Sequence, residues 1–282
     1  MTRLTQAGLA AMLLFASPAF AQAPAGGDSA ASAAHGPPPM PANVAELDAA
    51  LDAHDYAKLD ALHATLHTVD QALPFMSWEQ TRLLGGGGLY LSMLYMNDLW
   101  RLARAVPPTE PNAAAEADGL KGSAMLIGLY SYELIALDGA KCADPAAPGR
   151  WKDQLAQSPV WAHAGEIPAA DRAKMIEASL AAETQTASLR GRDELICRGT
   201  AQAVAAPAAS AQAPSEAQNG PGIAGHTYAV PLPPGDQSAF VDLTVWGPQQ
   251  AKLRANMRAD LARLMKLDTP KPAKPARPAA KR

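Results

Sequence analysis

The stretch from Leu89 to Ala105 reads LYLSMLYMNDLWRLARA, and the stretch from Leu120 to Asp138 reads LKGSAMLIGLYSYELIALD. In both, apolar residues occupy nearly every face of a helix rather than a single stripe. Helices of this kind lie at the centre of a bundle, where other helices cover all of their sides. Pro107-Pro108 and Pro111 predict a loop between the two segments, because proline does not continue a helix interior.

The residues before this centre show helical periodicity. Between Val44 and Leu73, leucines recur at three- and four-residue steps, which predicts an amphipathic helix. The stripe slips around His54, so two short helices joined by a tight turn are the alternative. A further helix is predicted from Ser77, because Ser77-Trp78-Glu79-Gln80 has the spacing of a capping box. Four glycines at 85–88 then indicate either a helix break or the close approach of another backbone.

The C-terminal half continues the helical pattern. Gly139 is placed to end the second central helix, and Ala169 to Cys197 is predicted as one long amphipathic helix. A last helix is predicted from Gly247-Pro248 to about Leu267. We therefore expect an all-α fold, a bundle of four to five helices, and the pattern leaves room for a short β element near 227–246.

Three segments are rich in alanine and proline and poor in large apolar residues, namely 22–42, 201–222 and 268–282. Such segments cannot bury enough apolar surface to offset the cost of ordering the chain. We expect a disordered N-terminal arm, a linker and a disordered basic Lys/Pro tail at these places. The remaining sequence then forms a helical bundle domain at 43–200, followed by an extended segment with a C-terminal helix at 223–267.

Residues 1–21 have the pattern of a secretory signal peptide. Arg3 precedes a short apolar core, which ends at the small-x-small sequence Ala19-Phe20-Ala21. The apolar core is shorter than the roughly 20 residues that span a bilayer. We therefore expect cleavage near Ala21 and a periplasmic or secreted protein.

Charge and hydropathy argue against two classes of partner. The chain carries 24 Lys and Arg against 27 Asp and Glu, a near balance that does not favour nucleic-acid binding. Asp98 and Arg101 interrupt the first central segment, and Lys121 and Glu133 bracket the second. Neither apolar run is then long enough for a membrane-spanning helix. We expect that the protein does not bind nucleic acid and is not an integral membrane protein.

Cys142 and Cys197 are the only cysteines of the chain. Thiols oxidise in the compartments that exported proteins reach, so a single pair predicts a structural disulfide. A reactive or metal-binding thiol pair is the alternative. The bridge would close a loop of 55 positions, and the chain-entropy account then gives it roughly 4 kcal/mol.

His63 and His67 are candidate metal ligands. They are four residues apart, a spacing that places two imidazoles on the same side of a helix and can bind one metal ion. No glutamate follows His63, so the pair does not form the zinc-protease motif. The alternative is two partly exposed histidines beside the leucine stripe. The sequence implies no other cofactor.

Glu133 is the carboxylate that interrupts an otherwise apolar helix. If buried, it would need a partner such as Arg82, Arg101 or Arg104, or a raised pKa. Because glutamate is rarely buried, we expect it at the helix surface instead. The chain has neither a Gly-x-Ser-x-Gly elbow nor a Gly-x-x-x-x-Gly-Lys phosphate loop. These absences do not favour an enzyme.

The C-terminal end is the most basic part of the sequence. Between 252 and 282 there are ten Lys and Arg and only two Asp. A basic amphipathic helix with a Lys/Pro tail can bind anionic surfaces or polymers, and a docked helix with a solubilising tail is the alternative. The candidate surface-binding residues are Lys252, Arg254, Arg258, Arg263 and Lys266.

The segment from Leu137 to Asp144, LDGAKCAD, with Ala147-Pro148 after it, resembles a segment of uncharacterised exported proteins from proteobacteria. The resemblance covers about a tenth of the chain and brings no assigned activity. It supports export and the structural interpretation of Cys142.

We expect a non-catalytic interaction or envelope-associated module, with a protein or an anionic envelope component as the partner. The first alternative is a binder of the anionic envelope surface that uses the basic C-terminal helix and tail. The second is a metal-binding protein or enzyme that uses His63 and His67.

Overall fold

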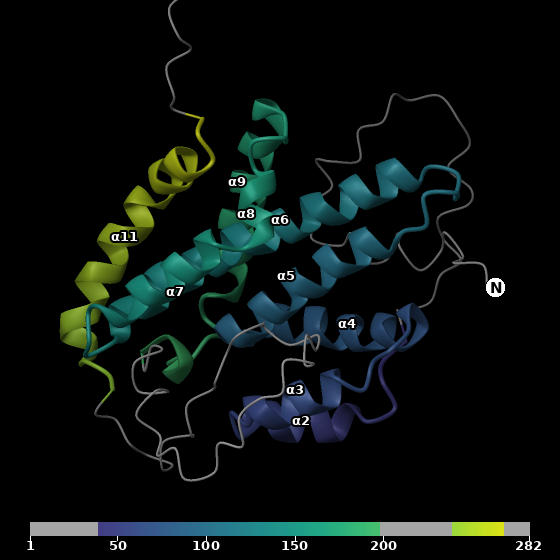
Figure 1. Cartoon of the computed structure of the whole chain (residues 1–282). Helices are drawn as coiled ribbons and strands as arrows, with labels where there is room; N and C mark the ends of the chain where they lie inside the picture. Colours follow the sequence, from purple (N-terminus) through teal and green to yellow (C-terminus); the bar gives the residue numbers. More distant parts are fainter. Residues whose placement is uncertain (1–38, 198–238, 268–282) are drawn as a thin grey trace, which may run out of the picture.

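The computed structural model describes residues 39–197 and 239–267, which form helices joined by short turns (Figure 1). The expected all-α class is confirmed. Within these two ranges the only β contact is an isolated bridge between Cys142 and Phe240. In chain order the helical elements are α2 (Val44–Asp52), α3 (Tyr56–His63), α4 (Val69–Leu84), α5 (Gly88–Ala105), α6 (Ala113–Asp138), the 3-10 turn η3 (Gly139–Lys141), α7 (Ala147–Ala156), α8 (Pro159–His163), α9 (Ala169–Thr186) and α11 (Leu243–Leu264).

Helices α5 and α6 form the centre of the bundle and lie side by side (Figure 1). Helix α4 packs against α5, while α9 and α11 pack against α6. Leucines on several faces of the central pair, such as Leu91, Leu94 and Leu134, are fully buried. The central position predicted from the two apolar segments is therefore confirmed.

Helix α6 begins at Ala113, seven residues before the predicted start at Leu120. Asn112, with a φ of +67°, turns the chain into the helix. The added residues are mostly exposed and include four alanines and a glutamate, which are good helix formers. Propensity rather than burial accounts for this extension. The predicted end of the helix is confirmed, with Gly139 at its C-cap.

The first segment is two short helices, the alternative that the slipped stripe suggested. Helix α2 ends at Asp52, and His54 adopts a φ of +54° in the turn before α3. The Asp55 side chain accepts a hydrogen bond from the Lys58 backbone N–H at 3.0 Å and so caps α3. Leu47 and Leu59 are fully buried and hold the pair on the bundle.

The predicted start of the next helix at Ser77 is wrong, because α4 begins at Val69. Its capping box is formed by Thr68 and Gln71, whose side chains bond each other's backbone N–H groups. Pro74 lies inside α4, where it removes one backbone donor without ending the helix. The Ser77 hydroxyl instead donates to the Leu73 carbonyl oxygen at 3.0 Å.

The glycine run both ends a helix and meets another backbone. Helix α4 ends at Leu84, and the φ angles of Gly86 and Gly88 are +94° and +75°. A Cβ atom on Gly86 would lie 2.7 Å from the Leu189 carbonyl oxygen. The turn between α4 and α5 therefore needs glycine for its conformation and for the space it leaves.

The long helix predicted from Ala169 to Cys197 is interrupted. Helix α9 ends at Thr186, and a single helical turn follows at 194–197. Between them Arg190 is buried, and it donates to the Asp138 and Glu183 carboxylates at 2.8 and 2.6 Å. These buried ion pairs hold Arg190 in the non-helical segment that interrupts the predicted helix.

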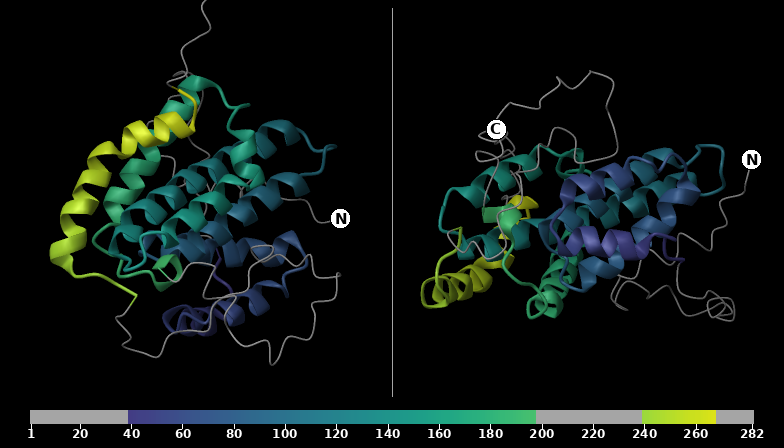
Figure 2. Two further views of the ribbon diagram at one scale, coloured as in Figure 1. Left: turned by 60° about the vertical axis from the view of Figure 1, so that its left-hand side comes forward. Right: turned by 90° about the horizontal axis from the view of Figure 1, so that it is seen from below.

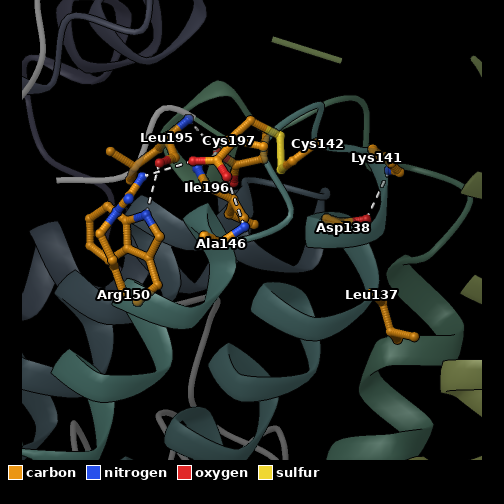
Figure 3. Close-up of a disulfide and its surroundings, with 12 residues drawn as sticks. Leu137, Asp138, Lys141, Cys142, Ala146, Arg150, Leu195, Ile196 and Cys197 are labelled. Carbon is orange, nitrogen blue, oxygen red and sulfur yellow. Dashed lines mark hydrogen bonds and ion pairs between the residues drawn. A yellow bond between two sulfur atoms is a disulfide. The ribbon is translucent and has the colours of Figure 1, made fainter. Parts of the chain in front are cut away.

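Cys142 and Cys197 form the predicted disulfide (Figure 3). It joins the residue after η3 to the helical turn that follows α9. Trp151 of α7 donates its indole N–H to the Leu195 carbonyl oxygen at 2.9 Å, which supports the same turn. Beside the bridge, Lys141 and Asp138 form an ion pair of 2.8 Å (Figure 3).

Helix α11 starts at Leu243, before the predicted Gly247-Pro248, and lies along one side of the bundle (Figure 2). Pro248 is inside the helix. Met257 and Leu261 are buried against the rest of the protein. The Gln250 side chain donates to the Leu137 carbonyl oxygen at 3.0 Å, so α11 is docked on α6.

None of the helices in the described ranges combines the length and the apolar character needed to cross a bilayer. Several predictions concern residues outside these ranges. They are the signal peptide at 1–21, most of the arm at 22–42, the linker at 201–222, the extended residues up to 238 and the tail at 268–282.

Candidate metal centre

Three buried polar side chains, one each from α3, α4 and α5, lie close together in the interior of the protein. They are His63 at the end of α3, Glu79 of α4 and Asp98 of α5. The nitrogen and oxygen atoms that they can offer to a metal ion lie within 4.8 Å of one another. Each residue follows a buried apolar residue by one helical turn, which places it on the inward face of its helix.

His63 and Asp98 form the closest contact of this cluster. The His63 Nε2 atom lies 2.6 Å from Asp98 Oδ2, and the two residues are 1% and 4% exposed. The Phe75 ring packs on the imidazole with its centroid 5.1 Å away. The His63 Nδ1 atom is buried without a hydrogen-bond partner among the described residues. The imidazole is therefore held in place but keeps one nitrogen unused.

Glu79 is the most unusual member because it is completely buried. Neither of its carboxylate oxygens has a hydrogen-bond partner within the described part of the chain. Burial raises the pKa of Glu79 well above its ordinary value, and the charge of Asp98 raises it further, while Arg101 acts in the opposite direction. A buried carboxylate without partners is costly, and a cation beside it would remove that cost.

Tyr95 adds a fourth buried polar side chain near this carboxylate. It lies one turn before Asp98 on α5 and is 1% exposed. Its hydroxyl has no hydrogen-bond partner among the residues that the structure describes. Burial raises the pKa of Tyr95, and the charge of Glu79 raises it further. The phenol therefore stays protonated and can donate a hydrogen bond at this place.

Arg101 connects the cluster to the surface. Its guanidinium Nη1 atom lies 3.2 Å from Asp98 Oδ1, while half of the arginine side chain is exposed. Asp98 is thus shared between a buried imidazole on one oxygen and a solvent-facing cation on the other.

One imidazole and two carboxylates are donors that suit Zn²⁺, Mn²⁺ or Fe²⁺. With metal–ligand bonds of about 2.0–2.2 Å, two donors of one ion are at most about 4.4 Å apart. The donor atoms of His63, Glu79 and Asp98 lie within 4.8 Å of one another, and the His63–Asp98 pair is closer, at 2.6 Å. For all three to bind one ion, the His63–Asp98 hydrogen bond must open.

The predicted pairing of His63 with His67 on one helix is not found. Helix α3 ends at His63, and His67 is exposed in the loop before α4. The His67 backbone N–H donates to the Gln71 side chain at 2.9 Å, as part of the start of α4. Because the chain leaves the helix between the two histidines, their four-residue spacing does not place them on one face. His63 keeps its candidate role, with Glu79 and Asp98 as the neighbours that sequence reasoning missed.

Glu133 is buried rather than at the surface, so that prediction is wrong. It is 0% exposed and accepts a hydrogen bond of 2.6 Å from the Ser179 hydroxyl. Burial raises its pKa to about 8. None of the predicted arginine partners forms a hydrogen bond with Glu133. The cations that lower its pKa are instead Arg190 and Arg254. The docking of α9 and α11 on α6 covers this position, which periodicity within α6 could not indicate.

The basic residues of α11 largely pair with acidic groups of the protein itself. Arg254 donates to Glu183 at 2.8 Å, Arg258 pairs with Glu177, and Arg263 donates to Asp260 at 2.6 Å. The remaining two candidates, Lys252 and Lys266, are exposed. Much of the positive charge predicted for a surface-binding helix is therefore used in docking α11 and in pairing along it.

A cleft of about 450 Å³ lies beside the glycine turn. Its lining includes Arg82, which pairs with Asp48, and the buried Arg190. Asp193 also lines the cleft, and its carboxylate accepts a hydrogen bond from the backbone N–H of Leu89 at 2.8 Å. The positive end of α5 is thus already bound to an internal carboxylate.

Comparison with known proteins gives no relative from which a function can be transferred: no family model, no curated protein and no solved structure matches the chain.

Proposed function

We propose that this protein binds a divalent transition-metal ion in its helical core, with His63, Glu79 and Asp98 as ligands. The observation that carries the proposal is the Glu79 carboxylate, which is completely buried and has no hydrogen-bond partner among the described residues. It lies beside an imidazole and a second carboxylate, and together these form a donor set for a metal ion.

A bound ion would act mainly on the fold. The three ligands come from α3, α4 and α5, so coordination would link the N-terminal helices to the centre of the bundle. An ion that binds only the folded chain stabilises it by about 2.7 kcal/mol when its concentration is one hundred times the dissociation constant. Metal binding is therefore expected to raise the melting temperature.

The test is metal stoichiometry in matched variants. Protein stripped with a chelator is loaded with Zn²⁺ or Mn²⁺ in separate experiments, dialysed and measured by inductively coupled plasma mass spectrometry. Glu79→Gln removes a ligand, and Glu133→Gln removes an equally buried carboxylate outside the cluster. His63→Gln and His67→Gln form a second matched pair.

The proposal predicts one bound ion per chain in the unaltered protein and in the Glu133→Gln and His67→Gln variants. Loss of bound metal is expected in Glu79→Gln and His63→Gln. The proposal fails if neither ion binds the unaltered protein, or if the ligand variants hold as much metal as their controls. Circular dichroism on each variant checks that lost binding does not reflect lost folding.

We also propose that the protein is exported, with residues 1–21 removed as a signal peptide, and that it acts as a non-catalytic, envelope-associated module. The disulfide between Cys142 and Cys197 supports an oxidising compartment. Cell fractionation and intact mass measurement test this, with a mature chain beginning at Gln22 as the expected result. A full-length cytoplasmic protein with free thiols would contradict it.

A further inference from the structure

Arg101 is the member of the buried cluster that reaches solvent. Its side chain is 51% exposed, whereas Asp98, with which it pairs, is 4% exposed. His63 and Glu79 are buried as completely as Asp98. Arg101 is therefore the solvent-exposed cation that contacts the cluster.

The Asp98 carboxylate has two occupied oxygens. Oδ2 contacts His63 Nε2 at 2.6 Å, and Oδ1 contacts Arg101 Nη1 at 3.2 Å. A divalent ion bound through this carboxylate would lie within several ångströms of the guanidinium, and like charges at such distances repel strongly away from bulk water. Arginine remains protonated throughout the accessible pH range, so it cannot relieve the repulsion by losing a proton. It can do so only by moving into solvent, and its half-exposed position allows this.

We propose that Arg101 is a displaceable counter-ion that competes with the metal ion for Asp98 and so regulates occupation of the centre. This inference rests on the proposed metal-binding function. The guanidinium pairs with Asp98 until an ion of higher charge replaces it, and metal binding releases the arginine side chain to the surface of α5.

Arg104 provides a control on the same helix. It lies one turn further along α5, is exposed, and forms no ion pair with any residue that the structure describes. Arg101→Gln and Arg104→Gln remove the same charge from neighbouring turns. Only the first variant removes a cation that contacts a proposed ligand.

The experiment measures the Zn²⁺ dissociation constant by competition with a chromophoric chelator in the full chain. The variants are Arg101→Gln, Arg101→Lys, Arg104→Gln and Glu79→Gln. We expect Arg101→Gln to bind Zn²⁺ at least about tenfold more tightly, because the repulsion is lost. Arg101→Lys keeps the charge and should stay within about threefold of the unaltered protein, as should Arg104→Gln.

Two different failures can be told apart. Equal or weaker Zn²⁺ binding in Arg101→Gln, with binding intact in the unaltered protein, overturns the role of Arg101 and leaves the metal centre standing. Absence of Zn²⁺ binding in the unaltered protein and in Arg101→Gln overturns the metal centre together with its regulation. Thermal unfolding without Zn²⁺ is measured for each variant, and Arg101→Lys provides the comparison if Arg101→Gln is destabilised.

Discussion

Gly86 lies directly against the main chain of Leu189, so that a Cβ atom on the glycine would be 2.7 Å from the Leu189 carbonyl oxygen. This contact joins the turn between α4 and α5 to the segment that follows α9. The φ of +94° at Gly86 would in addition strain any residue with a side chain.

Gly86→Ala is therefore expected to destabilise the protein by about 2 kcal/mol or more, through the left-handed backbone and the clash. Gly119→Ala is the matched control, because Gly119 lies in α6 and a Cβ atom there meets nothing within 4 Å. Alanine at that helical position should stabilise by about 0.5–1 kcal/mol. Urea unfolding of both variants measures the difference, and a neutral Gly86→Ala would contradict the close approach.

Removing the disulfide should weaken the fold without abolishing the centre of the bundle. The bridge joins residues 55 positions apart, and a closed loop of that length is worth roughly 4 kcal/mol in the chain-entropy account. The double variant Cys142→Ser with Cys197→Ser is expected to lose about that much in free energy of unfolding. Unaltered protein unfolded with and without a reducing agent serves as the control; identical curves would show that the bridge contributes little.

Glu133 predicts how stability changes with pH. Its pKa is raised from 4.5 to about 8 by burial, against the hydrogen bond from Ser179. The charge of Glu183 raises the pKa further, and Arg190 and Arg254 lower it. Between these pH values the folded chain holds a proton that the unfolded chain has released, so stability falls as pH rises from about 4.5 to about 8. At one pKa unit per about 1.4 kcal/mol, the upper limit of this loss is about 5 kcal/mol.

In the Glu133→Gln variant the side chain at position 133 is neutral at every pH. This variant should lack the part of the stability decline that Glu133 causes. The free energy of unfolding of the variant, minus that of the unaltered protein, is therefore expected to be larger at pH 8 than at pH 5. Glu116→Gln, which removes a carboxylate from the first turn of the same helix, should follow the unaltered protein. Urea unfolding at several pH values makes the comparison. Parallel curves for Glu133→Gln and the unaltered protein would rule out the titration.

Glu183 should matter far more to stability than its exposed partner. Its carboxylate accepts from the buried Arg190 at 2.6 Å and from Arg254, which is 42% exposed, at 2.8 Å. Glu183→Gln leaves Arg190 with less compensation in the interior and is expected to cost about 3 kcal/mol. Arg254→Gln breaks a contact near solvent and should cost less than about 1 kcal/mol. Equal losses in thermal unfolding would mean that Arg190 does not depend on Glu183.

The central position of α5 and α6 could be predicted because it depends on the local sequence pattern. The segments that include Leu94 and Leu134 are apolar on every face, and such helices are stable only when they are covered on all sides. Two other boundaries differ from the prediction: the Thr68–Gln71 spacing is a local capping-box signal that the prediction does not use, whereas the burial of Arg190 is a tertiary feature. The start of α4 at Val69 depends on the Thr68–Gln71 capping box, and the end of α9 depends on the burial of Arg190. For residues 151–168 the sequence predicts no element, although α8 and the second part of α7 lie there.

The candidate centre was only partly visible in the sequence. The spacing to His67 makes His63 a candidate ligand, yet its actual neighbours are 16 and 35 positions away, at Glu79 and Asp98. A signal for Asp98 existed, because it interrupts an apolar helix. Glu79 instead fits the spacing of a capping box that starts at Ser77, and no local pattern shows that it is buried.

The sequence by itself determined the helical class, the two central helices and the pairing of Cys142 with Cys197. Periodicity, glycine and proline positions and the presence of only two cysteines are sufficient for these conclusions, since they act locally or by elimination. Only the tertiary structure decided that Glu79 and Glu133 are buried, and that His63 meets Asp98. The physical reason is that burial and proximity arise when helices distant in the chain pack together, and side-chain spacing along one helix contains no information about the helix that covers it.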